Sequence, residues 1–430
     1  MLLHYVPQTP AMLPDGAYED VTEPIELMLY AANTAAAQEL HRRLEAMLQA
    51  AMQRQKAKNG PRVYLRFQPS GDAFLWRSEV KSGQISLGSN SMSAWGQAKI
   101  EVRLIVTRQP FWERDAETEV RLSSFMQPLI GTGGRSIRNH SDTQTTGNYV
   151  DIGPSDVAGS LPAPARIELQ NLVNASRMYS NIYIANEVLH TSHNYAYMVQ
   201  GENHVSTSGG TALTGYTGAS GGGVLQLSFS GITTPRWAYG ATAIRAAAGK
   251  TYRLLVRFNW YTIMAGNTIY VEPRIVDPVS MGNFNPYGVE KALPTPQSTL
   301  IDVGSLSFGD FEAAGAVHTM LAFRSAAQVL VEIDYLQPMP ADNFRHLVYL
   351  GGGVPNGGKV VDDGPEDRAY ELTTGGNQLP TVSARSKPIM LWPQTGFTQR
   401  IYVLQDRNGV STISDTFSVQ IFYRPRRLTI

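Results

Sequence analysis

Only one segment of this 430-residue chain shows a helical period, and this restricts the fold to one built mainly from strands. The segment begins at Asn33 or Thr34, either of which suits a helix N-cap, and Gly60 is placed to end it. Basic and amide side chains occupy its other face. Its predicted buried stripe consists of Ala37, Leu40, Leu44, Met47, Leu48 and Ala51.

The residues on either side of this helix have the pattern of an antiparallel sheet with one wet face. Apolar and polar residues alternate most clearly over residues 100–107. Shorter runs of the same kind occur at 23–30, 62–67 and 72–80. Roughly the first 115 residues therefore predict a small α+β unit, a sheet with a single helix packed on it.

Later strands follow one another without any helical period. The strands between residues 224 and 340 are numerous enough for a sandwich or jelly roll, whereas the segments on either side hold too few strands for a core of their own. We therefore expect one sandwich interrupted by a middle module. The terminal strand, residues 417–423, would close it, and Pro425 would end the ladder. The expected insertion points are two glycine-rich seams, 206–223 and 351–358, of which the first reads as a flexible linker.

The predicted fold class is mostly β. An N-terminal α+β domain, with an antiparallel sheet or split barrel and one helix, precedes a β-sandwich that carries an inserted β-sandwich or jelly-roll module. The predicted boundaries are 1–150 for the first domain, 151–200 and 343–430 for the two parts of the sandwich, and 201–342 for the inserted module.

Composition and charge exclude several classes of function. The 36 basic and 36 acidic residues balance, which argues against a field that grips a polyanion and against sequence-specific nucleic-acid binding. The absence of cysteine excludes disulfides, thiol catalysis and Cys-ligated zinc. We see no signal peptide and no apolar run of the ~18 residues that a membrane helix needs. We therefore expect synthesis in the cytoplasm and no membrane insertion.

Motifs for catalysis or for cofactors fail when their context is considered. Residues 218–222 match G-x-S-x-G, but a Gly/Ser/Thr tract rather than a strand precedes Ser220. Residues 353–359 match G-x-x-x-x-G-K, but Val360 stands where Ser or Thr must reach magnesium. Three histidines close together in the sequence could share a metal ion, but no carboxylate lies in register with them, and we interpret them as loop or surface residues: His190, His193 and His204. We expect no catalytic residue, no cofactor and no metal.

Aromatic residues are concentrated in the middle module. The period-two set at 252–260 reads as core, although Trp260 remains a candidate glycan contact. Trp237 and Tyr239 follow Thr-Thr-Pro-Arg, closer to a loop, and are better candidates for exposed rings that stack on sugars.

Several stretches resemble the distal tail proteins that cap the tail tube of long-tailed bacteriophages. VYLRFQPSGDAFLWRSEVKSGQI (63–85) and WGQAKIEVRLIVTRQPFWE (95–113) resemble the N-terminal belt domain. VDIGPSDVAGSLPAPARIEL (150–169) looks like the linker that follows it. SKPIMLWPQTGFTQRIYVL (386–404) and VQIFYRPRR (419–427) look like the end of the galectin-like sandwich.

The middle module resembles a different kind of domain. VLVEIDYLQPMPADNFR (329–345) is similar to the last strand of the carbohydrate-binding jelly rolls found in tail proteins with an extra module. The smallest members of the family lack such a module. The resemblance covers about half of the chain, and its weight lies in the order of the pieces.

The resemblance implies a structural virion protein at the phage tail tip or baseplate, without enzymatic activity. It implies a homo-hexameric ring, with the tail-tube protein, the hub, tip or receptor-binding proteins and host-surface carbohydrate as partners. A helix face and the C-terminus supply candidate subunit contacts, namely Arg42, Arg43, Arg424, Arg426 and Arg427. The alternatives are a carbohydrate-binding or carbohydrate-active β-sandwich protein and a tail-tube or baseplate hub subunit.

Overall fold

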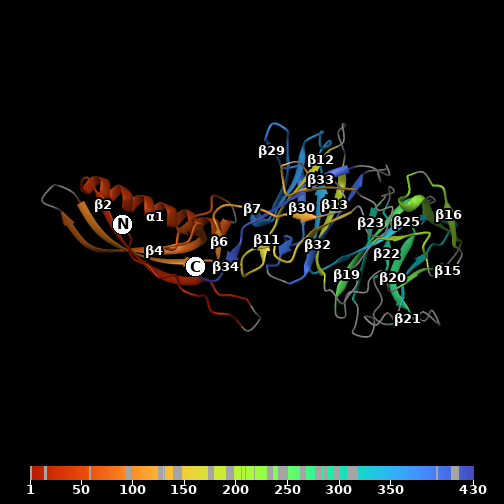
Figure 1. Ribbon diagram of the computed structural model, residues 1–430, viewed down its shortest axis with the longest axis horizontal. Coiled ribbons are helices and arrows are strands. Elements are labelled where there is room, and N and C mark those ends of the chain that lie inside the picture. The colour runs from red at the N-terminus through yellow and green to blue at the C-terminus, as the bar shows by residue number, and fades with distance from the viewer. Residues whose placement is uncertain are drawn as a thin grey trace. The chain divides into compact units, whose positions relative to one another are not determined.

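A computed structural model describes most of the chain. The residues outside its description are 1, 14–16, 58–59, 93–97, 124–128, 130, 139–147, 173–178, 190–197, 205, 209, 217, 230–235, 241–249, 262–267, 277–282, 285–288, 295–299, 308–317, 394–395 and 408–415. The described residues are mostly β, in antiparallel sheets, as the sequence predicted (Figure 1).

The chain divides into two compact units. Unit 1 comprises Met1–Thr118, Ala158–Ala163 and Arg424–Ile430, and unit 2 comprises Glu119–Val157 and Pro164–Tyr423. The first boundary falls at residue 118 rather than at the expected residue 150. The reason is strand pairing, because β8 (Leu122–Ser123) pairs with β10 (Tyr149–Ile152), and β10 pairs with a strand near residue 400 of unit 2.

Unit 1 is a sheet with one helix packed on it, as expected. The strand order is β1 (Leu2–His4), β2 (Val21–Ala31), β5 (Ala98–Arg108), β4 (Trp76–Met92), β6 (Trp112–Arg114) and β34 (Arg426–Arg427), and β3 (Tyr64–Phe67) also pairs with β4. The long strand β4 thus pairs with β5 along one part and with β3 and β6 along another, as in a split barrel.

Helix α1 (Thr34–Ala57) covers this sheet only in part. Asn33 is its N-cap, since its Oδ1 accepts a hydrogen bond from the Ala36 N–H at 2.9 Å. Three residues of the predicted stripe are buried against the sheet: Ala37, Leu48 and Ala51. Leu40 and Met47, which were also predicted to be buried, are 36% and 49% exposed. The helix therefore leaves part of its apolar face open.

One sandwich of unit 2 is built from segments that lie on both sides of an insertion. Its first sheet has the order β30 (Val382–Arg385), β26 (Phe344–Tyr349), β13 (Tyr179–Leu189), β32 (Thr398–Arg407), β10 and β8. Its second sheet contains β29 (Gln378–Leu379), β28 (Arg368–Leu372), β27 (Lys359–Asp363), β12 (Arg166–Asn171), β33 (Thr416–Tyr423) and β9 (Arg135–Arg138). The expected pairing across the insertion is therefore present.

The terminal strand takes the place that its alternation predicted. β33 pairs with β12 and β9, and its alternate side chains are buried: Phe417, Val419, Ile421 and Tyr423. Pro425 does not end the pairing of the chain, because Arg426 and Arg427 form β34 in unit 1.

The inserted module is a second pair of sheets. One contains β16 (Gly210–Thr214), β17 (Gly223–Phe229), β25 (Val329–Pro340), β19 (Thr251–Tyr261), β23 (Leu300–Ser307) and β14 (Val199–Gln200). The other contains β15 (Ser206–Ser208), β18 (Arg236–Gly240), β24 (His318–Arg324), β20 (Tyr270–Val276), β21 (Asn283–Phe284) and β22 (Lys291–Ala292). The module therefore begins by Val199 and ends near Pro340.

Neither glycine-rich seam is the insertion point that the sequence predicted. The stretch 206–223 is not a linker, because it forms β15, β16 and a single 3-10 turn, with β16 paired along β17. The stretch 351–358 follows β26 and lies within the sandwich, where Gly357 N–H donates to Asn171 O at 2.9 Å. Strand partners supplied from elsewhere in the chain order both segments.

His346 gives unit 2 a dependence on acid that can be measured. Its ring stacks on Tyr183 at 4.6 Å, and Nε2 lies 2.8 Å from Asn181 Oδ1. Burial lowers the pKa of His346 to about 4, and nearby Arg385 acts in the same direction. The unfolded chain therefore binds more protons than the folded chain between pH 6.5 and about 4, so this histidine should reduce stability as the pH falls through that window.

The measurement is the denaturant midpoint of the wild type and of His346→Gln across this pH range. The substitution should flatten the loss of stability on acidification. Parallel curves for the two proteins would contradict the assignment.

Candidate functional site

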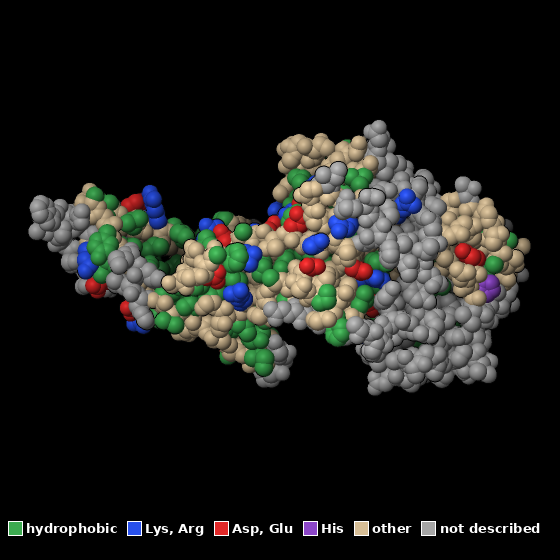
Figure 2. Space-filling model, viewed as in Figure 1, with side chains coloured by type: hydrophobic (Ala, Val, Ile, Leu, Met, Phe, Trp, Pro, Cys, Tyr) green, Lys and Arg blue, Asp and Glu red, His purple; other side chains and the backbone are tan. Residues whose placement is uncertain are grey.

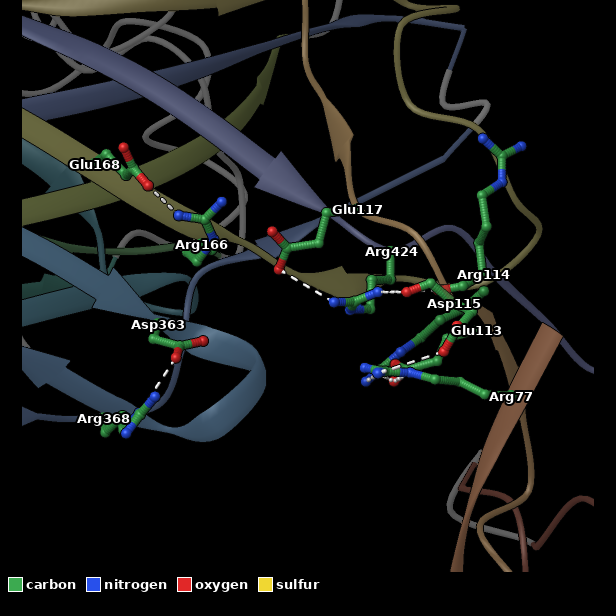
Figure 3. Close-up of polar contacts among 11 residues, drawn as sticks. Arg77, Glu113, Arg114, Asp115, Glu117, Arg166, Glu168, Asp363, Arg368 and Arg424 are labelled. Atoms are coloured by element: carbon green, nitrogen blue, oxygen red, sulfur yellow. Dashed lines mark hydrogen bonds and ion pairs between the residues drawn. The ribbon is translucent and has the colours of Figure 1, made fainter. Parts of the chain in front are cut away.

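The C-terminal arginines are engaged within unit 1. Arg424 lies 3.6 Å from a carboxylate oxygen of Glu117 and donates to the main-chain oxygen of Asp115 (Figure 3). Arg426 lies 3.4 Å from Glu113 Oε2, and its guanidinium stands 3.9 Å from the centre of the Phe111 ring. The sequence predicted that these two side chains would meet a neighbouring subunit or solvent, but acids and a ring of their own unit hold them.

Other charged side chains take part in the same set of ion pairs around the C-terminal arginines. Arg77 shares Glu113 with Arg426, at 2.9 Å from Oε1 (Figure 3). Arg427 is more open, since its side chain is 45% exposed and lies over the Trp76 ring at 4.5 Å. Arg427 is therefore the C-terminal arginine with the most surface left for a partner.

The two helix arginines are surface residues. The side chains of Arg42 and Arg43 are 73% and 71% exposed, and each lies 3.1 Å from a carboxylate oxygen of Glu39. Exposed pairs of this kind contribute little to stability, about 0–1 kcal/mol. Both guanidinium groups thus remain available to a partner, and their role as a subunit contact stays a prediction.

A buried ion pair fastens the N-terminal segment to the sheet of unit 1. Glu23 on β2 accepts from Arg108 Nε at 2.6 Å, and the two side chains are 1% and 0% exposed. Tyr5 Oη donates to Glu23 Oε1 at 2.7 Å, and the Gln8 N–H donates to Oε2 at 2.9 Å. Burial is the main cause of the raised pKa of Tyr5, so its hydroxyl stays protonated as a donor. This cluster holds Tyr5 beside the helix.

An apolar groove opens between α1 and β3 in unit 1. Its volume is about 340 Å³, and its walls come from the helix, from β3 and from the faces of β2, β4 and β5. Tyr5, Leu44 and Met47 line it together with residues 63–67. Among the described residues β3 pairs only with β4, so its other edge is free for a further strand or side chain.

The surface of unit 1 agrees with this description. On the face shown in Figure 2, hydrophobic side chains gather over unit 1, with Lys, Arg, Asp and Glu side chains scattered among them. Exposed large apolar residues of this unit include Val6, Met12, Tyr30, Met47 and Phe74. Of these, Met47 lines the groove, and exposed apolar side chains gathered at a groove are typical of a site that meets another protein.

Two of the aromatic residues singled out in the sequence lie in a strand. Trp237 and Tyr239 belong to β18, which pairs with both β15 and β24, and their role as glycan contacts stays a prediction. The side chains of these residues and of Trp260 lie outside the described residues. The predicted core face of β19 is confirmed for Tyr252, Leu254, Val256 and Phe258.

Sequence reasoning missed one exposed aromatic residue of unit 2. The side chain of Trp392 is 44% exposed and follows β31 (Met390–Leu391). The available signal was a tryptophan at the end of an apolar run, directly before Pro-Gln-Thr-Gly. Residues that follow a strand in this way lie in surface connections, where binding residues are often found.

The described residues hold no cluster of three or more His, Asp or Glu side chains that could bind a metal ion. Ser220 is fully buried, and a 3-10 turn rather than a helix begins at it, which does not match a nucleophile elbow. No helix within the described part of the chain is long and apolar enough to span a membrane.

Comparisons with known proteins give little guidance. No family model and no curated protein matches the chain. An isomalto-dextranase of Arthrobacter globiformis T6 complexed with panose has 9% identity and a TM-score of 0.25, over 48% of this chain and 40% of the other. A CBM22-1–CBM22-2 tandem domain of Paenibacillus barcinonensis Xyn10C has 11% identity and a TM-score of 0.24, over 55% of this chain and 100% of the other.

A third solved structure, that of the infectious bursal disease virus Gt strain, has 9% identity and a TM-score of 0.18, over 72% of this chain and 81% of the other. The chain spans less than half of the isomalto-dextranase. TM-scores this low carry no argument about function.

Proposed function

We propose that this chain is a structural virion protein that forms a ring at the distal end of a phage tail tube. The ring joins the tube to the tail tip, and unit 2 faces host-surface glycans. In this role the chain has no enzymatic activity, and its partners are further copies of itself, the tail-tube protein and the tip proteins.

The observation that carries the proposal is the order of the folded parts. A one-helix α+β unit comes first, a β-sandwich follows, and a second β-sandwich is inserted between its strands. This is the order that the resemblance to distal tail proteins implied, and the pairing of β13 with β26 and β32 supports it.

The groove of unit 1 supports self-assembly. It combines an apolar wall, the edge of β3 that no described strand pairs with, and the exposed Met47. Because the groove is concave, the surface that fills it on a neighbouring subunit must protrude and so must be a different patch. Contacts between two different patches of identical subunits generate closed rings when the rotation between neighbours closes. The exposed Met12, in the segment that precedes β2, offers an apolar side chain of the required kind.

The test is Met47→Lys, studied by light scattering behind a sizing column and by negative-stain microscopy. The wild type should form six-fold rings, and the variant should dissociate, because a charge in the groove must be desolvated when a neighbour docks. Gln49→Lys is the matched control, since Gln49 is an exposed helix residue that does not line the groove.

Rings from Gln49→Lys but not from Met47→Lys, with both variants folded, are the expected result. Rings from Met47→Lys as well would remove the groove from the interface. A wild type that stays monomeric at every concentration would contradict the proposed ring.

The alternative of a free carbohydrate-binding protein draws on one observation, that unit 2 consists of two β-sandwiches with an exposed tryptophan. It predicts a monomer that binds saccharides. The same sizing experiment separates the two functions.

A further inference from the structure

A second pocket lies within unit 2, at the junction of the sandwich and the inserted module. Its volume is about 400 Å³. The sandwich contributes the end of β13 and, from the segment between β31 and β32, Trp392, Pro393 and Phe397. The inserted module contributes Lys250, directly before β19, and Pro340, at the end of β25. Pockets that bind small molecules occur preferentially at such junctions between modules.

The walls combine flat rings with charged and amide groups. Trp392 and Phe397 supply the aromatic surface, and Lys250 and the exposed Asp342 supply a donor and an acceptor. A pyranose ring has an apolar face of C–H groups and an equatorial belt of hydroxyls. This pattern is met by one aromatic plane with polar groups at its edge.

Three buried amide side chains fix the main chain that carries Trp392. The Trp392 N–H donates to Gln399 Oε1 at 2.9 Å, and the Trp392 C=O accepts from Gln399 Nε2 at 2.8 Å. Asn343 holds Met390 in the same two-sided way, at 2.9 and 2.7 Å, and Asn186 Nδ2 donates to the Met390 oxygen at 2.8 Å. The exposed ring therefore stands on a rigid backbone, which reduces the entropy lost when a ligand stacks on it.

The side-chain oxygen of Asn186 is an acceptor that this network does not use. Asn186 is 3% exposed and lines the pocket, and its Oδ1 is buried without a hydrogen-bond donor among the described residues. A buried acceptor without a partner is costly, and it is often found where a ligand completes the network. A sugar hydroxyl is a donor of the required size.

We propose that this pocket binds a pyranose unit of a neutral saccharide, stacked on Trp392 and held by Asp342 and Lys250. The opposite charges of the lysine and the neighbouring carboxylates favour a neutral ligand over a sulfated or phosphorylated one. The described residues that line the pocket do not include the candidate glycan contacts that the sequence suggested: Trp237, Tyr239 and Trp260. It gives the proposed contact with host glycans a defined place, and it rests on that proposed function only for its biological role.

The test uses purified full-length protein and a panel of four neutral trisaccharides, maltotriose, cellotriose, triacetylchitotriose and mannotriose, at millimolar concentrations. Binding is followed by saturation-transfer NMR and by tryptophan fluorescence. At least one trisaccharide should bind the wild type. Trp392→Ala should weaken binding about tenfold or more, Trp392→Phe about threefold, and Asp342→Asn about threefold to tenfold.

Leu350→Ala is the matched control, because Leu350 is a 73% exposed apolar residue of unit 2 that does not line the pocket. It should bind as the wild type does. Unchanged melting temperatures of the Trp392 variants show that the loss is not unfolding, which is expected for a side chain already 44% exposed.

The outcomes separate the pocket from the ring. Absence of binding by every member of the panel, or equal binding by Trp392→Ala, overturns the site even if rings form. Binding that depends on Trp392 in the dissociated Met47→Lys variant supports the site whether or not rings form.

Discussion

Replacing Glu23 with alanine is expected to lower the free energy of unfolding of unit 1 by about 3–5 kcal/mol. The change leaves the guanidinium of Arg108, which is 0% exposed, without its carboxylate in a site that water does not reach. It also removes the acceptor that Tyr5 and the Gln8 N–H use, so the segment that lines the groove should detach from the sheet. Chemical denaturation followed by the fluorescence of unit 1 gives the free energy directly.

The matched control is Asp20→Ala, which breaks the ion pair with Lys81. That pair has similar geometry, at 2.6 Å, but its side chains are 36% and 35% exposed, so its loss should cost less than about 1 kcal/mol. The double variant Glu23→Leu/Arg108→Met should recover only part of the loss. It removes the unpaired buried charge, but Tyr5 and the Gln8 N–H still lack their acceptor. Equal effects of Glu23→Ala and Asp20→Ala would show that burial does not govern this interaction.

The parts of the fold that could be predicted are those that depend on a periodic pattern or a capping residue within a short stretch of sequence. The N-cap at Asn33, the helix that follows it and the alternation of β33 each depend on residues close together in the chain. The interrupted sandwich could be inferred as well, since strands too few for a core must find partners across the insertion. The pairing of Ile184 with Val403 bears this out.

The parts that could not be predicted depend on partners distant in sequence. Glycine-rich residues 206–223 look like a linker until β17 supplies a neighbour along 210–214. Arg426 looks like a free terminal charge until Glu113, some 300 residues earlier, is placed beside it. In both cases the local sequence is compatible with disorder, and the tertiary contact decides the structure.

The candidate sites depend on such contacts too. The unit 1 groove exists because α1 buries only part of its apolar stripe, and a sequence does not show how far a helix stands from a sheet. The Trp392 pocket requires amides from three separate strands or loops to meet at one turn. A tryptophan before a proline is visible in the sequence, but the amide hydrogen bonds that hold its main chain are not.

The other large effect is expected at Glu187, where the sandwich and the inserted module share a buried hydrogen-bond network. Glu187, 2% exposed, accepts from Tyr252 Oη at 2.6 Å and from Tyr402 Oη at 2.7 Å. Tyr252 belongs to the inserted module and Tyr402 to the sandwich. Burial, reinforced by the neighbouring Glu187, raises the pKa of both phenols, so both hydroxyls stay protonated as donors near neutral pH.

Glu187→Ala should therefore cost about 3–5 kcal/mol, since two buried hydroxyls lose their charged acceptor at once. The loss should fall on the junction, where Asn148 Nδ2 also donates to Gln337 Oε1 at 3.0 Å and residues of both modules form one apolar cluster. Differential scanning calorimetry should show the two modules unfolding together in the wild type and in separate transitions in Glu187→Ala.

A double-mutant cycle tests whether the network is the cause. Tyr252→Phe should cost about 1–2 kcal/mol in the wild type and much less in Glu187→Ala, because the acceptor is already gone. Tyr216→Phe is the control, since its hydroxyl donates to Glu332 at 3.0 Å within the inserted module alone and should leave the transitions joined. If the modules unfold separately already in the wild type, the insertion is only tethered to the sandwich, and the junction would lack the rigidity that its buried network implies.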